Sequence, residues 1–176
     1  LAKKVNSFNV GDGFEDNSDI GPLIDISGLK KVERHLEDAV SKGAKVLTGG
    51  KKSSLGGLYF EPTVLTDVKE HMILFKEETF GPLAPLFKFK DINEVVNMAN
   101  NTNYGLAGYI FTKDLNIAWQ VSEELQFGMV GINSGILSTE VAPFGGVKES
   151  GVGREGSIEG MDEYMEIKYL CFGNIM

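Results

Sequence analysis

The stretch APFGGVKESGVGREG, residues 142–156, ends in GVGREG, which matches the dinucleotide-binding pattern G-x-G-x-x-G letter for letter. In that pattern the glycines carry a strand through a tight turn into a helix whose N-terminus faces a pyrophosphate. Here the preceding residues PFGGVKES have the composition of a loop, and only 20 residues follow Gly156. That length is too short for the helix and second strand that the pattern needs. We therefore predict that GVGREG is a chance match and that its glycines serve another purpose.

Working outward from this stretch, three segments have the periodicity of amphipathic helices. The first begins at Ser27 as its N-cap, carries apolar residues at three- and four-residue steps, and ends at Gly43. The other two begin at Asp91 and Asp114, whose short carboxylates suit N-cap positions. These helices account for the longest regular patterns in the chain.

Short apolar or alternating segments lie between the helices and predict strands. They are AKVLTGG (44–50), LYFEPTVLT (58–66), LFKFK (86–90), LAGYIFT (106–112) and MVGIN (129–133). Pro62, inside the second segment, indicates an edge or a bend because proline cannot donate a ladder hydrogen bond. Since strands and helices alternate with short connections, we predict an α/β fold with a mostly parallel sheet flanked by helices.

The last third of the chain has a different character. Residues 133–160 are rich in glycine and lack regular periodicity, which predicts a long ordered loop of the kind that often carries function. The segment DEYMEIKYLCFG, residues 162–173, predicts one terminal strand that can pair with the sheet of another chain. We therefore divide the chain into a main portion, residues 1–160, and a C-terminal oligomerisation strand, residues 161–176.

Composition and charge narrow the classes of function. The chain has 176 residues, 42% of them hydrophobic, which suits one globular domain with a core. A net charge of −8 without a cluster of lysine or arginine argues against nucleic acid as a partner. No apolar run approaches the roughly 18 residues of a membrane helix, so we expect no membrane partner.

The cysteine and histidine content argues against disulfide, thiol and metal chemistry. Cys171 is the only cysteine, which rules out an internal disulfide and favours a cytoplasmic location. It lies in the apolar segment YLCF, where we expect a packed or edge-strand thiol rather than a reactive one. His35 and His71 are far apart in the sequence and no His/Cys pair has ligand spacing, so we expect no metal site.

The first residues indicate that more sequence belongs in front of them. Leu1 is not a start methionine, and LAKKVNSF lacks the features of a cleavable signal. The segment has the composition of the end of a helix already under way. We expect the chain to be a piece of a longer protein.

Several motifs, in their order along the chain, carry a resemblance to a known family. They are IGPLID (20–25), EETFGP (77–82), NYGLAGYIFTKD (103–114) and APFGGVKESGVGREG (142–156). Together they resemble the C-terminal part of the catalytic domain of an aldehyde dehydrogenase, over nearly the whole chain. The final GREGSIEGMDEYMEIKYLCFG is most similar to the succinate-semialdehyde dehydrogenase branch. The resemblance assigns dinucleotide binding to a separate domain and gives the glycines of GVGREG a role in close backbone packing.

The resemblance implies two cofactor-binding residues in EETFGP. Glu78 would accept hydrogen bonds from the ribose hydroxyls beside the nicotinamide, a role that suits a carboxylate because it only accepts. Phe80 would pack beside the nicotinamide ring. Without the motif, Glu78 would be read as a solvated loop acid.

The resemblance also implies substrate-binding residues in the glycine-rich loop. Phe144 would line the aldehyde tunnel, with core packing as the alternative. Ser138 would direct its hydroxyl toward the far carboxylate of the substrate, with a backbone hydrogen bond as the alternative. Glu155 would lie near a proton path, or else be tied to backbone. Lys148 and Arg154 would hold the loop by hydrogen bonds and charge pairing.

The family reaction implies that essential parts are missing. In that reaction a cysteine thiolate attacks the aldehyde, hydride passes to NAD or NADP, and a glutamate activates water for hydrolysis of a thioester. Both residues would precede Leu1, and Cys171 lies in the wrong segment to be the nucleophile. We expect the chain alone to be inactive and to bind no cofactor, although the complete enzyme uses NAD or NADP and a small aldehyde.

Two other functions remain open at this stage. The chain could be a noncatalytic assembly module that forms a homo-oligomer through its terminal strand. Alternatively, GVGREG could be a nucleotide site, which a dinucleotide titration would test.

Overall fold

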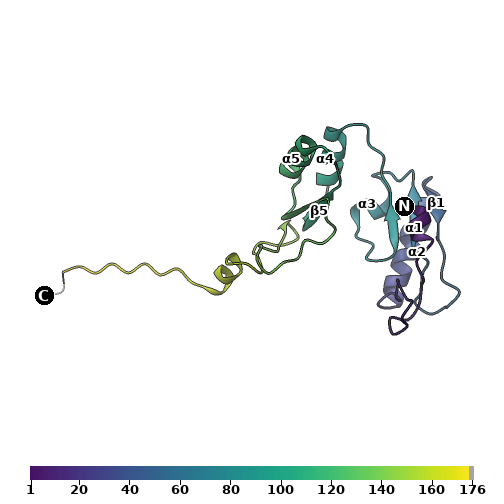
Figure 1. Ribbon diagram of the computed structural model, residues 1–176, viewed down its shortest axis with the longest axis horizontal. Coiled ribbons are helices and arrows are strands. Elements are labelled where there is room, and N and C mark those ends of the chain that lie inside the picture. The colour runs from purple at the N-terminus through teal and green to yellow at the C-terminus, as the bar shows by residue number, and fades with distance from the viewer. Residues whose placement is uncertain (175–176) are drawn as a thin grey trace. The chain divides into compact units, whose positions relative to one another are not determined.

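A computed structural model describes residues 1–174 of the chain (Figure 1). Its contacts divide the chain into two compact units, Leu1–Lys88 and Phe89–Met176, and each is described by itself. The division at residue 160, predicted from the change in sequence pattern there, remains a prediction.

The first unit is built around one long helix. The element α2 (Ile26–Ser41) follows a short helix, α1 (Ala2–Val5), and buries its apolar stripe in the core of the unit. Its N-cap is Asp25 rather than the predicted Ser27, because the Asp25 side chain accepts from the Gly28 N–H at 2.8 Å. The Ser27 hydroxyl donates to the same carboxylate instead. The buried core of the unit comprises Leu29, Val32, Leu36, Ala39, Ala44, Phe60, Leu65, Val68, Met72 and Leu74.

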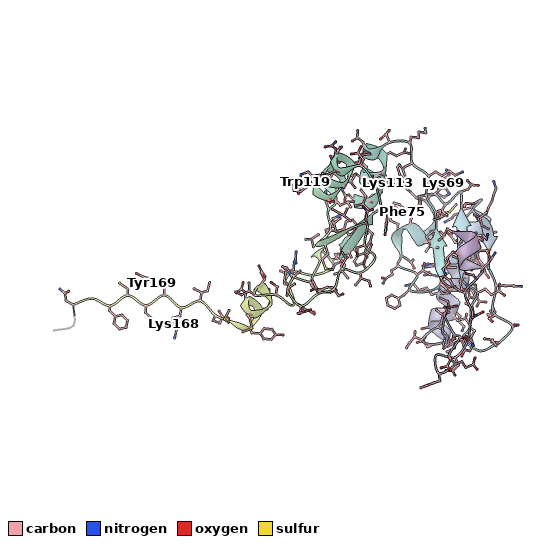
Figure 2. All side chains as sticks on the ribbon, viewed as in Figure 1. Lys69, Phe75, Lys113, Trp119, Lys168 and Tyr169 are labelled. Atoms are coloured by element: carbon pink, nitrogen blue, oxygen red, sulfur yellow. The ribbon has the colours of Figure 1, made fainter. Side chains whose placement is uncertain are left out.

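A small three-stranded sheet packs in the same unit. It has the order β1 (Lys45–Thr48), β2 (Thr63–Thr66), β3 (Leu83–Pro85), with the short helix α3 (Ile73–Lys76) between β2 and β3. Phe75 of α3, labelled in Figure 2, packs edge-on against Phe87 with ring centroids 5.4 Å apart. The predicted strand 86–90 is wrong: the strand lies just before it, and pairing with β2 ends after the Leu86 N–H donates to Leu65 O at 2.9 Å.

The second unit contains two capped helices and two small sheets. The helices α4 (Ile92–Asn100) and α5 (Leu115–Glu124) begin after Asp91 and Asp114, and both carboxylates accept from backbone N–H groups as predicted. Helix α5 connects two parallel strands, β5 (Ala107–Ile110) and β6 (Met129–Ile132). The strands β4 (Tyr104–Gly105) and β7 (Val147–Lys148) form an antiparallel pair.

The α/β class is confirmed, but the mostly parallel sheet is not found. Of the four strand pairs in the described residues, two are parallel and two are antiparallel. Both parallel pairs have a helix in their connection, α3 or α5. No helix lies between β1 and β2, so that connection returns the chain in the opposite direction. Sequence periodicity identified most strands but could not show which connections turn back.

The end of the chain differs from the single strand predicted over residues 162–173. Residues 162–164 belong to a 3₁₀ helix, η1 (Glu159–Tyr164), and residues 165–174 join no sheet in this chain. Their backbone N–H groups find no strand to pair with among the described residues, and the predicted pairing with another chain remains a prediction. Residues 175–176 of the predicted segment lie outside the described part.

Over residues 1–174, no helix has the length and apolar character needed to cross a membrane.

Candidate functional site

The loop EETFGP lies against helix α2 in the first unit. Glu77 forms an ion pair with Arg34, and its Oε2 lies 3.2 Å from Nε2 of His35. The other ring nitrogen of His35, Nδ1, lies 2.9 Å from the hydroxyl of Thr79. Since His35 is fully buried, it contacts this loop from inside the unit.

The two adjacent glutamates of the loop have different environments. Hydrogen bonds from His35, and then from Arg34, hold the pKa of Glu77 below its ordinary value. Glu78 is exposed and makes no hydrogen bond or ion pair with any described residue. The carboxylate of Glu77 is therefore bound within the protein, while the carboxylate of Glu78 is free to accept hydrogen bonds from a ligand.

Phe80 has a backbone conformation that is unusual for its residue type. Its φ is +48°, and 82% of its surface is exposed. A left-handed backbone is unfavourable for a residue with a Cβ. Because the ring is mostly exposed, burial of the side chain does not offset this cost. Such strain concentrates at ligand-binding loops, where the surrounding structure enforces it.

Gly81 allows this loop to approach α2 closely. A Cβ built on Gly81 would lie 2.5 Å from Cγ2 of Val32, which is fully buried. The glycine of EETFGP is therefore required by backbone packing against the helix.

A pocket of about 480 Å³ opens beside Phe80. Its cationic side chains, Lys30, Lys31 and Arg34, come from α2, while Thr79 and Phe80 come from the loop. An exposed aromatic face next to ammonium groups suits a planar ligand that carries negative charge. Sequence reasoning missed the two lysines, although LKKVER places three cations within one turn and a half of a predicted helix.

The two substrate-binding candidates meet in the second unit. Ser138 and Phe144 line one pocket of about 320 Å³ whose other walls are largely apolar. The remaining lining residues are Leu106, Ala107, Tyr109, Met129, Gly135, Ile136 and Leu137. The hydroxyl of Ser138 has no hydrogen-bond partner among the described residues, so the backbone-bonded alternative is not found. The pocket combines an apolar wall with one free hydroxyl.

Glu155 contributes to the second unit through its backbone. Its N–H donates to Phe144 O at 2.7 Å and its carbonyl accepts from the Phe144 N–H at 2.8 Å. Its side chain is exposed and has no partner among residues 1–174. Only the backbone of Glu155 is bonded, so a tie of its side chain to backbone is not found among these residues, and a proton-path role remains a prediction.

Two cationic residues hold the glycine-rich loop by hydrogen bonds, as expected, while the expected charge pairing is not found among the described residues. Nη1 of Arg154 donates to Gly146 O and Gly153 O, both at 2.8 Å. Nζ of Lys148 donates to Asn100 O at 2.9 Å and Thr102 O at 3.1 Å. Both interactions are with carbonyl groups.

Gly145 and Gly153 of this loop serve close packing. A Cβ on Gly145 would lie 2.7 Å from Gly153 O, and one on Gly153 would lie 2.5 Å from Cδ of Glu163. Gly151 has open space around it, so the packing role expected for all glycines of GVGREG is not found there. The loop also lines a pocket of about 720 Å³, which contains Arg154 and the carboxylates Glu155 and Glu163. Because the guanidinium already serves two carbonyls and both acids repel phosphate, GVGREG is unsuited to a dinucleotide.

The predicted residues fall into two groups by unit. Glu78 and Phe80 belong to the first unit, while Ser138, Phe144 and Glu155 belong to the second. Of the two positions expected for Cys171, packed or edge-strand, the packed one is wrong, because Cys171 is exposed in residues 165–174; an edge strand here remains a prediction. Within residues 1–174, no group of histidine, cysteine and carboxylate side chains could hold a metal ion.

Comparison with known proteins identifies the class. The sequence profile of the aldehyde dehydrogenase family matches residues 1–170. The chain belongs to the aldehyde dehydrogenase family, which consists of oxidoreductases.

Particular relatives are similar over almost the whole chain. Glutarate-semialdehyde dehydrogenase of Pseudomonas aeruginosa is 55% identical over 99% of this chain and 36% of its own length. The NADP(+) succinate-semialdehyde dehydrogenase of Escherichia coli is 53% identical over 98% of this chain and 36% of its own. The crystal structure of succinate-semialdehyde dehydrogenase from Burkholderia pseudomallei has a TM-score of 0.95 and 56% identity, covering 98% of this chain and 36% of that one. The chain therefore spans about a third of the length of these relatives.

Proposed function

We propose that this chain is the C-terminal portion of an NAD(P)-dependent aldehyde dehydrogenase that oxidises succinate semialdehyde to succinate. The observation that carries the proposal is the loop EETFGP, in which Glu78 is left free beside the exposed and strained Phe80. Relatives named for semialdehydes with a distal carboxylate support the substrate class.

Each group of residues has its own task in this proposal. Glu78 accepts hydrogen bonds from the ribose hydroxyls of the cofactor, and Phe80 limits the positions of the nicotinamide ring. The cofactor, when bound, accepts hydride from the aldehyde carbon. Lys30 and Lys31, in the pocket beside Phe80, supply positive charge for this ligand, while Arg34 remains paired with Glu77.

The second unit serves the aldehyde. Phe144 and the apolar wall of its pocket exclude water from the carbon chain of the substrate, while the Ser138 hydroxyl donates to its distal carboxylate. The nucleophilic cysteine and the general-base glutamate belong to the remainder of the enzyme, so we expect the chain alone to be inactive. A cytoplasmic location and a homo-oligomer are part of the same proposal.

The test uses a full-length hybrid in which this chain replaces the segment that it matches in the Burkholderia pseudomallei enzyme. We expect absorbance of NAD(P)H to rise with succinate semialdehyde for the hybrid and to stay flat for the chain alone. Glu78→Gln should raise KM for the cofactor by about tenfold, since hydrogen bonds to a charged group are lost. Glu37→Gln, which changes an exposed acid on α2, is the matched control.

Two results would contradict the proposal. Activity of the chain alone would mean that the nucleophile lies within it, and an unchanged cofactor KM for Glu78→Gln would remove Glu78 from the cofactor site.

A second candidate function is a noncatalytic assembly module. It is supported by residues 165–174, which join no sheet while exposing Ile167, Tyr169 and Phe172. This function predicts a stable dimer of the chain together with an inactive hybrid.

A further inference from the structure

We infer that His35 is a positioning residue that sets the direction of Glu78 by holding the side chains on both sides of it. The three residues Glu77, His35 and Thr79 form what we term the loop clamp. The inference deepens the proposed function, on which its cofactor step rests.

The clamp has a defined geometry. Nε2 of the His35 ring lies 3.2 Å from Oε2 of Glu77, and Nδ1 lies 2.9 Å from Oγ1 of Thr79. One imidazole therefore contacts two loop residues that are two positions apart. His35 comes from α2, more than forty residues earlier in the chain, and is fully buried.

Chemistry assigns the proton on the ring. A carboxylate only accepts, so Nε2–H donates to Glu77, while the Thr79 hydroxyl, which can donate or accept, completes the hydrogen bond at Nδ1. Arg34 lies 3.3 Å from Nε2, but its guanidinium is also a donor, and both groups share the Glu77 carboxylate as their acceptor. The ring is thus satisfied at both nitrogens by the loop.

The backbone converts this clamp into a direction for Glu78. Glu77 has an extended conformation, with φ −105° and ψ 131°. In an extended chain successive side chains point to opposite sides, so the side chains of Glu77 and Thr79 face α2 together while that of Glu78 faces away. Glu78 is accordingly exposed.

The next residues fix the loop at its other end. Gly81 packs against Val32, which lies one helical turn before His35 on the same face of α2. Between these two anchors the chain must pass through Phe80 with φ +48°. His35 and Val32 together therefore determine how Glu78 and Phe80 are presented.

The first experiment measures the clamp in the chain itself. Amide ¹⁵N order parameters of Glu78 and Phe80 should fall from the rigid range, about 0.85, to below about 0.6 in His35→Phe. Thr79→Val should loosen the same amides while leaving the buried ring in place.

Two further variants serve as comparisons. His35→Gln, whose amide can still donate to Glu77, should give intermediate order parameters. Leu36→Ala, which weakens the neighbouring core position, should leave these amides rigid.

The second experiment measures the consequence for the cofactor in the full-length hybrid. His35→Phe should raise KM for the cofactor on the order of tenfold, with KM for the aldehyde unchanged. In a Glu78→Gln background the same substitution should add little, because its effect acts through Glu78.

Each outcome decides one step. Unchanged order parameters in His35→Phe and Thr79→Val, or equal loosening by Leu36→Ala, would overturn the clamp. If the effects of His35→Phe and Glu78→Gln on KM for the cofactor are additive, His35 does not act through Glu78 and has only a structural role. A third outcome separates the clamp from the proposed function. If His35→Phe loosens the loop but the Glu78→Gln hybrid binds cofactor normally, the clamp would stand. The proposed function, and with it the cofactor role of His35, would be overturned.

Discussion

At the scale of single residues, two neighbouring glutamates share a motif and differ in every contact. Glu77 is bound by His35 and Arg34, whereas Glu78 makes no contact with a described polar group. The sequence EETFGP alone cannot separate these roles, because the partners of Glu77 lie more than forty residues away. The motif identified the loop, and only the packing against α2 distinguishes its two acids.

Phe80 gives a prediction about backbone strain. Because its φ is +48°, Phe80→Gly should be more stable than Phe80→Ala by about 1 kcal/mol, as glycine carries no Cβ. Urea unfolding of the two variants gives this difference directly. Equal stabilities would mean that the loop relaxes out of the left-handed conformation when the ring is removed.

Glu77 gives a prediction about pH. Its pKa in the folded chain is below the ordinary 4.5, so its contribution to stability is complete above that value and is lost as pH falls through the lowered pKa. The Tm of the parent chain should therefore exceed that of Glu77→Gln at neutral pH, and the gap in Tm should narrow as the pH falls below the ordinary pKa of 4.5 and through the lowered pKa of Glu77. A gap independent of pH would show that the contribution of Glu77 is not ionic.

At the scale of elements, local signals located the three long helices α2, α4 and α5. Asp91 and Asp114 cap α4 and α5 as predicted, since capping depends on residues only two or three positions apart. At α2 the cap lies at Asp25, where an aspartate two residues before Ser27 takes the position.

The strands and the loop contacts were less predictable. The alternation of LFKFK suggested a strand, but the partner β2 pairs with residues 83–85 instead. Pairing partners are chosen by tertiary packing, which periodicity does not encode. For the same reason, sequence patterns did not predict the loop clamp or the lysines of the pocket beside Phe80. Ser138 and Phe144 line one pocket, and the roles that the family resemblance implies for them remain predictions.

The contact between the loop and α2 gives a prediction about packing. Gly81→Ala should destabilise the chain by about 1–3 kcal/mol, because the added methyl would overlap Val32. Gly13→Ala has open space around it and should change stability by less than about 0.5 kcal/mol. Adding Val32→Ala to Gly81→Ala should make the two costs less than additive, as measured by urea unfolding. If the two losses in unfolding free energy are strictly additive, the new methyl group does not act through contact with Val32.

At the scale of the whole molecule, residues 165–174 have no partner strand within the described part of this chain. Their backbone groups join no sheet, and Ile167 and Tyr169 are almost entirely exposed; Lys168 and Tyr169 are labelled on this stretch in Figure 2. An unpaired extended segment with apolar side chains favours pairing with a second copy.

The terminal segment gives a prediction about assembly. Light scattering during size-exclusion chromatography should show the parent chain moving toward a dimer as its concentration rises, whereas a chain ending at Tyr164 should stay monomeric. Tyr169→Pro should behave like the shortened chain, because proline removes a backbone donor without removing the segment. A dimer formed equally by all three proteins would place the interface outside residues 165–174.

Lys168 stands in the middle of this extended segment and is exposed. An accessible lysine in a chain without ladder hydrogen bonds is a favourable cleavage site for trypsin, while a lysine held in a sheet is protected. Digestion at this one peptide bond would therefore report, over time and without any label, what fraction of the chains has found a partner.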